Sequence, residues 1–189
     1  MSVMAIRYED IPVRDGGFTV GDLDEMPDDG RRYELVDGVL LVSPSHCWEH
    51  QRGASRLDAV LERACPSYLD VLHPVDVRRG ERTSVQPDLS VVRADDLVAG
   101  ERFAAVPVLV VEILSPSSVG VDRLFKRDVY ARLGVPSYWI VDLDEPSVAV
   151  LELHNGVYRD RSIICGDRLF EADEPFSVAF RPSDLVRRR

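Results

Sequence analysis

The sequence predicts a mixed β-sheet with helices packed on it, an α/β or α+β domain that carries additional β-hairpins. A continuously apolar run at 108–114 is typical of a central strand that is buried on both faces. The dipeptides Asp37-Gly38 and Asn155-Gly156 each separate two strand-like runs, which is a strong hairpin signal. Between these strands, the segment at 45–64 has the apolar spacing of an amphipathic helix.

The first half of the chain is predicted to begin with an arm at 1–18, followed by a short helix that the capping box Thr19-x-x-Asp22 opens. The helix at 45–64 ends before Pro66, because the residue preceding a proline disfavours helical geometry. The alternating pattern then predicts one half-buried strand at 67–79, a turn at 80–82, and a next strand at 87–92.

In the second half, a loop at 94–105 precedes the central strand, and a helix then ends at Gly134. Asp122, Lys126 and Tyr130 are spaced four apart on that helix and share one face. The remaining predicted elements are a buried strand at 137–143, the hairpin around 155–156 and a short strand at 176–180.

Length and composition predict one domain over residues 1–189, with its core at about 30–155. The chain is 45% hydrophobic and 30% charged, as in a globular protein. It contains no apolar run of roughly 20 residues and no signal-peptide pattern, and its three cysteines are widely spaced. We therefore expect a cytoplasmic protein with reduced thiols and no membrane association.

The net charge of −10 argues against a surface that grips polyanions indiscriminately. It leaves nucleic acid possible, because acids that hold a divalent metal add negative charge and an Arg-rich patch can still make local contacts. Lys126 is the single lysine among 23 basic residues. Arginine replaces lysine where only charge matters, so a retained lysine modestly favours a role for a compact ammonium group.

Two acids, Asp88 and Glu112, lie within apolar runs, where a carboxylate needs a cation or a hydrogen-bond network. If their strands are neighbours, the two carboxylates suit Mg²⁺ or Mn²⁺, which activates water for phosphodiester hydrolysis. Lys126 would then orient that water or offset charge on the phosphate, and Glu34 is a further candidate acid. The alternative is structural: a turn residue at Asp88, a buried Arg partner for Glu112, and an Asp122–Lys126 helix ion pair.

Seven blocks in order carry a resemblance: R-Y-E-L-V-D-G-V-L, S-P-S-H-C-W-E-H, Q-P-D-L-S-V-V, V-V-E-I-L-S-P-S-S, D-R-L-F-K, Y-A-R-L-G-V and S-Y-W-I-V-D. Across 32–153 the chain resembles the Uma family of restriction endonucleases, in the PD-(D/E)XK nuclease superfamily. The resemblance implies a restriction-endonuclease-like mixed sheet flanked by helices, metal-dependent cleavage of DNA and a homodimer. It also implies a catalytic set of Glu34, Asp88, Glu112 and Lys126, with Asp88 and Glu112 as metal ligands.

The same resemblance matches His50 to the histidine of the family's following helix, and His50 and Asp122 are possible accessory residues. One position departs from the superfamily pattern: Leu114 stands two residues after Glu112, where the pattern places lysine. Lys126 matches the family's own Asp-x-x-x-Lys block. We expect its ammonium to reach the place that the lysine of the superfamily pattern would occupy.

Two other functional classes remain open on the sequence. An inactive nuclease fold that binds nucleic acid or protein would keep the architecture without the chemistry. A more distant alternative is a zinc peptidase, because His46, Glu49 and His50 match the H-x-x-E-H motif, although the sequence marks no third ligand.

Overall fold

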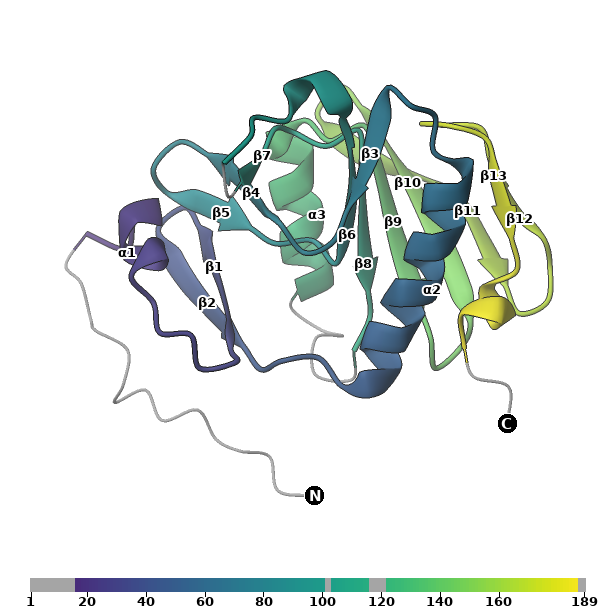
Figure 1. The fold of residues 1–189 in the computed structure, drawn as a ribbon, viewed down its shortest axis with the longest axis horizontal. Helices are drawn as coiled ribbons and strands as arrows, with labels where there is room; N and C mark the ends of the chain where they lie inside the picture. The colour runs from purple at the N-terminus through teal and green to yellow at the C-terminus, as the bar shows by residue number, and fades with distance from the viewer. Residues whose placement is uncertain (1–15, 101–102, 116–121, 187–189) are drawn as a thin grey trace.

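The computed structural model describes residues 16–100, 103–115 and 122–186, and Figure 1 shows their arrangement. The elements in chain order are α1 (Val20–Asp24), β1 (Arg32–Val36), β2 (Val39–Ser43), α2 (Trp48–Ala64), β3 (Leu69–Leu72), β4 (Asp76–Arg79), β5 (Thr83–Val85), β6 (Leu89–Arg93), η2 (Ala94–Asp96), β7 (Phe103–Ala104), β8 (Leu109–Ile113), α3 (Asp122–Leu133), β9 (Ser137–Asp142), β10 (Ser147–His154), β11 (Val157–Cys165), β12 (Phe170–Ala172), β13 (Val178–Phe180) and η3 (Pro182–Leu185).

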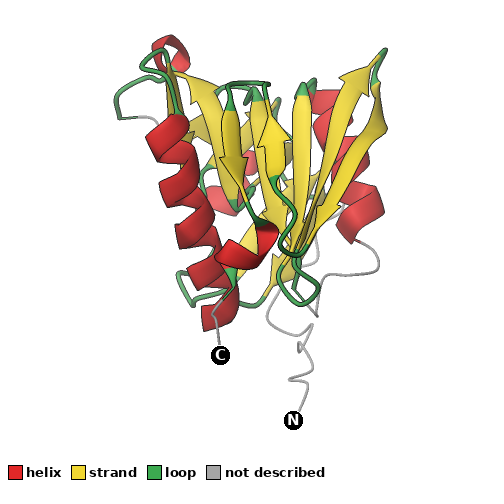
Figure 2. Cartoon of the chain, turned by 90° about the vertical axis from the view of Figure 1, so that its right-hand side faces the viewer, coloured by secondary structure: helices red, strands yellow, loops and turns green. Residues whose placement is uncertain are grey.

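A six-stranded sheet in the order β11-β10-β9-β8-β6-β3 forms the centre of the molecule. Strands β8 and β9 are parallel and are joined through α3, whereas the other pairs of this sheet are antiparallel. All five residues of β8 are buried, so the predicted central strand is confirmed. Helices α2 and α3 lie on opposite faces of the sheet (Figure 2).

The side chains of β8 alternate between these two faces. Val111 packs into the core beneath α2, whereas Val110 packs into the core beneath α3. Glu112 follows the same alternation as Val110 and therefore faces α3. The period-two geometry of a strand thus decides which helix meets the buried carboxylate.

A second sheet, in the order β2-β1-β5-β4-β7, packs on the α3 side. Val36, Val77 and Val85 of this sheet share one apolar core with Val129 of α3. This packing places β1, which carries Glu34, against the face of the central sheet that carries Glu112.

Both predicted hairpins are confirmed. The central residues of each turn have positive φ, with 50° and 83° at Asp37 and Gly38 and 49° and 80° at Asn155 and Gly156. These angles fit the type I′ turn, which matches the twist of the flanking strands. The predicted capping box is also present, since Thr19 and Asp22 cap each other at the start of α1.

The prediction of a single strand at 67–79 was wrong. The segment forms β3 and β4, which belong to different sheets, and Pro74 lies between them. Proline has no N–H group to donate to a ladder, so the chain leaves one sheet there and enters the other. The turn at Gly80 likewise leads into β5, and β6 comes afterwards.

Two boundaries also differ from the expectations. Helix α2 begins at Trp48, three residues later than predicted, and most of the expected arm at 1–18 lies outside the described residues. No helix in the described ranges is long and apolar enough to cross a membrane.

Candidate functional site

The four predicted catalytic residues come from four segments and meet in one buried place. Glu34 lies on β1, Asp88 immediately before β6, Glu112 on β8 and Lys126 on α3, and all four are at least nine-tenths buried. Strand β6 pairs with β8, with Leu89 opposite Val111, so Asp88 lies beside the end of β8 that carries Glu112. The fold therefore gathers the residues that the sequence separates by up to 92 positions (126 − 34).

Lys126 bridges two of the carboxylates. Its Nζ lies 2.9 Å from Glu112 Oε1 and 3.4 Å from Glu34 Oε1. The hydroxyl of Tyr130, one helical turn after Lys126, donates to the same Glu112 oxygen at 2.5 Å. The expected reach of Lys126 toward Glu112 is thus present, while Leu114 occupies the position two residues after Glu112.

Burial and neighbouring charge set the ionisation of this group. Burial raises the pKa of Glu112 to about 7; the charge of Lys126 opposes the shift, and the charges of Asp88 and Glu34 add to it. Burial alone would lower the pKa of Lys126, but the combined attraction of Glu112 and Glu34 holds it above its ordinary value. Burial and the same two carboxylates keep the pKa of Tyr130 well above its usual value, so the phenol remains a hydrogen-bond donor.

Asp88 accepts hydrogen bonds at the other side of the site. The amide of Ile113 donates to Asp88 Oδ2 at 2.8 Å, and His50 Nε2 lies 3.0 Å from the same oxygen. His50 Nε2 is also 3.0 Å from the carbonyl oxygen of Ile113. Burial alone would raise the pKa of Asp88, but the close approach of His46, His50 and the Ile113 amide holds it well below its usual range.

Arg32 lies between the two halves of the site. Its Nη1 is 3.4 Å from Asp88 Oδ1 and its Nε is 3.5 Å from Glu34 Oε2. The backbone amide of Gln86 donates to Glu34 at 2.8 Å, while the Gln86 carbonyl accepts from Arg32 at 3.3 Å. Three carboxylates and two fixed cations therefore occupy one buried volume.

Sequence reasoning overlooked Arg32, although a signal was available. Arg32 and Glu34 are two apart on one strand, so their side chains share a face. Tyr130 was placed on the face of Lys126 without a role, and its contact with Glu112 supplies one. Asp122 begins α3, but its side chain is outside the described part of the chain.

The residues of the H-x-x-E-H pattern separate in space. His46 and His50 stack with their rings parallel to within 4° and their centroids 3.7 Å apart, and both approach Asp88. Glu49 is exposed at the start of α2. The two histidines thus join the carboxylate site, where one ring nitrogen of each and an oxygen of Asp88 all lie within 4.8 Å of one another.

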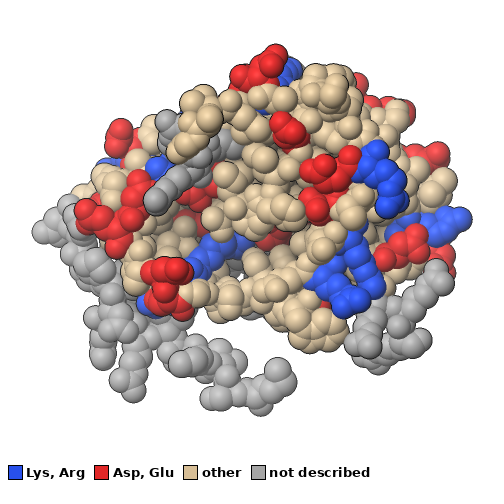
Figure 3. All heavy atoms as spheres, viewed as in Figure 1, with Lys and Arg blue, Asp and Glu red and all other residues tan. Residues whose placement is uncertain are grey.

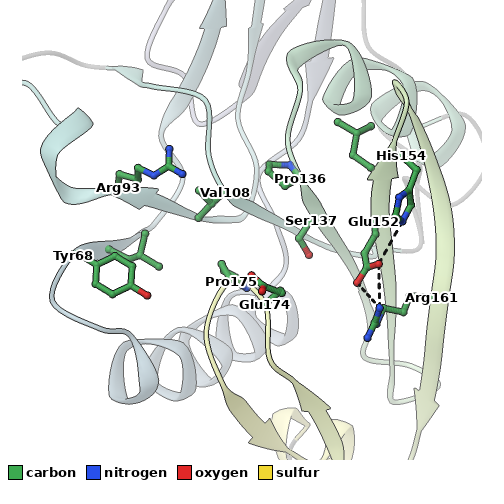
Figure 4. Close-up of a pocket in the computed structure, with 12 residues that line it drawn as sticks. Tyr68, Arg93, Val108, Pro136, Ser137, Glu152, His154, Arg161, Glu174 and Pro175 are labelled. Carbon is green, nitrogen blue, oxygen red and sulfur yellow. Dashed lines mark hydrogen bonds and ion pairs between the residues drawn. The ribbon is translucent and has the colours of Figure 1, made fainter.

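A pocket lies beside the starts of β8 and β9 (Figure 4). It has a volume of about 530 Å³, and Val108 and Ser137 line it next to the first residues of β8 and β9. Glu152 and Arg161 form an ion pair at 3.1 Å in its wall. Because Glu112 is near the last residue of β8, this pocket is separate from the carboxylate site.

Charge is mixed rather than segregated on the face of the molecule that Figure 3 shows. On the face shown in Figure 3, basic and acidic side chains of the described residues lie interspersed. This distribution agrees with the net charge of −10 and with local arginine contacts rather than a broad basic surface.

The chain is similar to a known protein family and to a solved structure. The sequence matches the Uma2 family, described as "Putative restriction endonuclease", over residues 20–183. The chain belongs to the Uma2 family. The resemblance predicted from the ordered blocks is confirmed, and Uma2 membership supports a nuclease-like function.

A solved structure agrees with the Uma2 assignment at the level of fold. It is titled as a putative nuclease belonging to DUF820 from Anabaena variabilis and is 19% identical in sequence. The match covers 89% of this chain and 97% of the other, with a TM-score of 0.73. The predicted mixed α+β nuclease fold is therefore confirmed. No curated protein matches this Uma2 chain.

Proposed function

We propose that the protein is a metal-dependent endodeoxyribonuclease that hydrolyses phosphodiester bonds in DNA. The observation that carries the proposal is the convergence of Glu34, Asp88 and Glu112 on Lys126 and Arg32 in one buried site. Burying several carboxylates together is costly, and a fold tolerates such a cluster when cations compensate it. The match to the Uma2 family, described as "Putative restriction endonuclease", supports this reaction class.

The donor set fits a hard divalent cation. Asp88 and Glu112 would hold Mg²⁺ or Mn²⁺ with Glu34 in support, because carboxylate oxygens are the ligands these ions prefer. Burial is the main cause of the raised pKa of Glu112, and the nearby charges of Asp88 and Glu34 add to it. A divalent cation would offset both contributions. When bound, such an ion polarises a phosphoryl oxygen and acidifies a water molecule.

The side chains of the chain itself supply position and charge. The Lys126 ammonium, held between Glu112 and Glu34, would position the attacking water and offset negative charge that develops on the scissile phosphate. Tyr130 fixes one oxygen of Glu112 through its hydroxyl. Attack by water on the phosphorus with cleavage of the P–O3′ bond, as the superfamily resemblance implies, would leave a 5′-phosphate and a 3′-hydroxyl.

Arg32 and His50 are proposed as positioning residues. The guanidinium of Arg32 spans Asp88 and Glu34, and its pKa is raised because attraction by Glu34, Glu112 and Asp88 outweighs burial. His50 and the amide of Ile113 together orient one oxygen of Asp88. This positioning is the accessory role that we propose for His50.

We further propose a homodimer, so that two copies of the site address the two strands of a duplex. The support is the superfamily resemblance, and the molar mass in solution tests it. A cytoplasmic location is proposed as well, and the free thiols of Cys47, Cys65 and Cys165 suit a reducing compartment.

The function is tested by incubating the purified protein with supercoiled plasmid in Mg²⁺, Mn²⁺ or EDTA, with a structured RNA in parallel. The proposal expects nicked or linear plasmid with either metal and none in EDTA, and products that a ligase can rejoin because they carry a 5′-phosphate. Cleavage of RNA alone would change the substrate class. No cleavage under any metal would favour a nuclease fold that binds without cutting.

A further inference from the structure

A group of three side chains, which shares only Asp88 with the set of Glu34, Asp88, Glu112 and Lys126, has the composition of a transition-metal site. His46, His50 and Asp88 each offer a ligand atom, and these atoms all lie within 4.8 Å of one another. His46 precedes α2, His50 lies in its first turn, and Asp88 reaches them from the segment before β6. Two segments that are distant in the sequence therefore present two imidazoles and one carboxylate to the same point.

The two distances that join Asp88 to the histidines resemble those between ligands of one metal ion. Asp88 Oδ1 is 3.3 Å from His46 Nε2, and Asp88 Oδ2 is 3.0 Å from His50 Nε2. Ligands about 2.0–2.1 Å from a tetrahedral zinc ion lie about 3.3 Å from each other. Small movements of these side chains would bring all three atoms to bonding distance.

One of the two imidazole nitrogens lacks a hydrogen bond. His46 Nε2 is buried and makes no hydrogen bond within the described part of the chain, although Asp88 Oδ1 is within ion-pair distance. A buried polar atom without a partner costs free energy, and a cation would satisfy it. The parallel stacking of His46 on His50 holds this nitrogen on the side that faces Asp88.

We propose that His46, His50 and Asp88 form a binding site for one borderline divalent metal ion, such as Zn²⁺, which is distinct in ligand type from the carboxylate set. Imidazole nitrogen favours zinc, cobalt and nickel over magnesium, which prefers oxygen. Asp88 is common to both groups, so a zinc ion here would occupy a carboxylate that the nuclease reaction requires. Binding of zinc itself does not depend on the proposed nuclease function.

The test measures zinc binding to the intact metal-free protein by competition with a chromophoric chelator, without DNA. We expect one Zn²⁺ per chain, and His46→Ala should weaken binding at least about tenfold. His73→Ala is the control, because His73 is exposed and pairs with a single acid, Asp58, at 3.3 Å. This variant should bind zinc like the unaltered protein.

Cobalt provides a second measurement that is independent of the chelator. Co²⁺ bound by nitrogen and oxygen in a four-coordinate site absorbs visible light strongly, and His46→Ala should remove that absorption. A melting curve in EDTA verifies that His46→Ala is folded, and His46→Gln repeats the test with a side chain that fills the same space. Absence of stoichiometric binding, or binding that neither variant weakens, would overturn the proposal and leave His46 and His50 as hydrogen-bonding partners of Asp88.

Discussion

The ammonium of Lys126, on α3, lies 2.9 Å from the carboxylate of Glu112, on the central strand β8. Both groups are buried, so each depends on the other for compensation of its charge. Lys126 belongs to helix α3, whereas the E-x-K pattern would place a lysine on strand β8, two residues after Glu112, where this chain has Leu114. The consequences of this relationship can be measured for stability as well as for activity.

Removing one member of the pair should destabilise the fold more than removing both. Lys126→Met leaves Glu112 and Glu34 buried without their shared ammonium, and we expect a loss of about 3–5 kcal/mol in the free energy of unfolding. The double variant Lys126→Met/Glu112→Gln has no buried charge mismatch at this pair and should recover much of that loss. Urea unfolding in EDTA measures all the variants, and strictly additive losses would contradict the coupling.

The stability of the metal-free protein should depend on pH through Glu112. Its pKa is about 7 in the folded chain, compared with an ordinary value of 4.5, so the folded state retains the proton over this interval. The contribution of Glu112 is therefore fully present below about pH 4.5 and is lost as pH rises through about 7. The slope attributable to this group is at most about 1.4 kcal/mol per pH unit.

Glu112→Gln provides the comparison for that pH dependence. The amide does not titrate, so the free energy of unfolding of this variant should fall less steeply between pH 4.5 and 7 than that of the unaltered protein in EDTA. Parallel curves for the two proteins would show that Glu112 does not carry the raised pKa.

His50 should contribute to stability through its contact with Asp88. His50→Ala removes the imidazole that approaches Asp88 Oδ2 at 3.0 Å and opens space beside α2, and we expect a loss of about 1–3 kcal/mol. His73→Ala is the matched exposed histidine and should change stability by less than about 0.5 kcal/mol. Equal losses of stability for the two substitutions would mean that the contact between His50 and Asp88 does not stabilise the fold.

Gly53 tests how tightly α2 is held against the central sheet. Alanine normally favours a helix by about 1 kcal/mol over glycine. At Gly53, however, an added Cβ would lie 2.5 Å from Leu143 Cδ1, which is too close without movement of that side chain. We therefore expect Gly53→Ala to lower the melting temperature. A raised melting temperature would mean that Leu143 yields at little cost.

Much of the fold followed from local chemistry. The turns at Asp37-Gly38 and Asn155-Gly156 were predictable because few dipeptides adopt two positive φ angles readily. The strand at 67–79 was mispredicted because alternation describes each half correctly but does not indicate to which sheet the half belongs. Pro74 lies where the chain leaves the first sheet, and long-range packing then decides that β4 joins the other sheet.

The site was predictable to the extent that its residues break a pattern. Asp88 and Glu112 are acids within apolar runs, and Lys126 is the single lysine of the chain. Arg32 escaped notice because its spacing from Glu34 indicates a shared strand face but not a contact with Asp88. That contact depends on β1 packing against the other sheet. The approach of His46 to Asp88 likewise depends on where α2 begins, which the sequence placed three residues too early.

The most direct measurement of the central claim is the rate of nicking of supercoiled plasmid in Mn²⁺ by the unaltered protein, Asp88→Asn, Glu112→Gln and a control, Glu152→Gln. Glu152 lies on the same sheet in the wall of the separate pocket and carries the same change of charge. The account predicts metal-dependent nicking that both site substitutions reduce at least about a hundredfold and the control leaves intact. Nicking that survives Asp88→Asn and Glu112→Gln would contradict it.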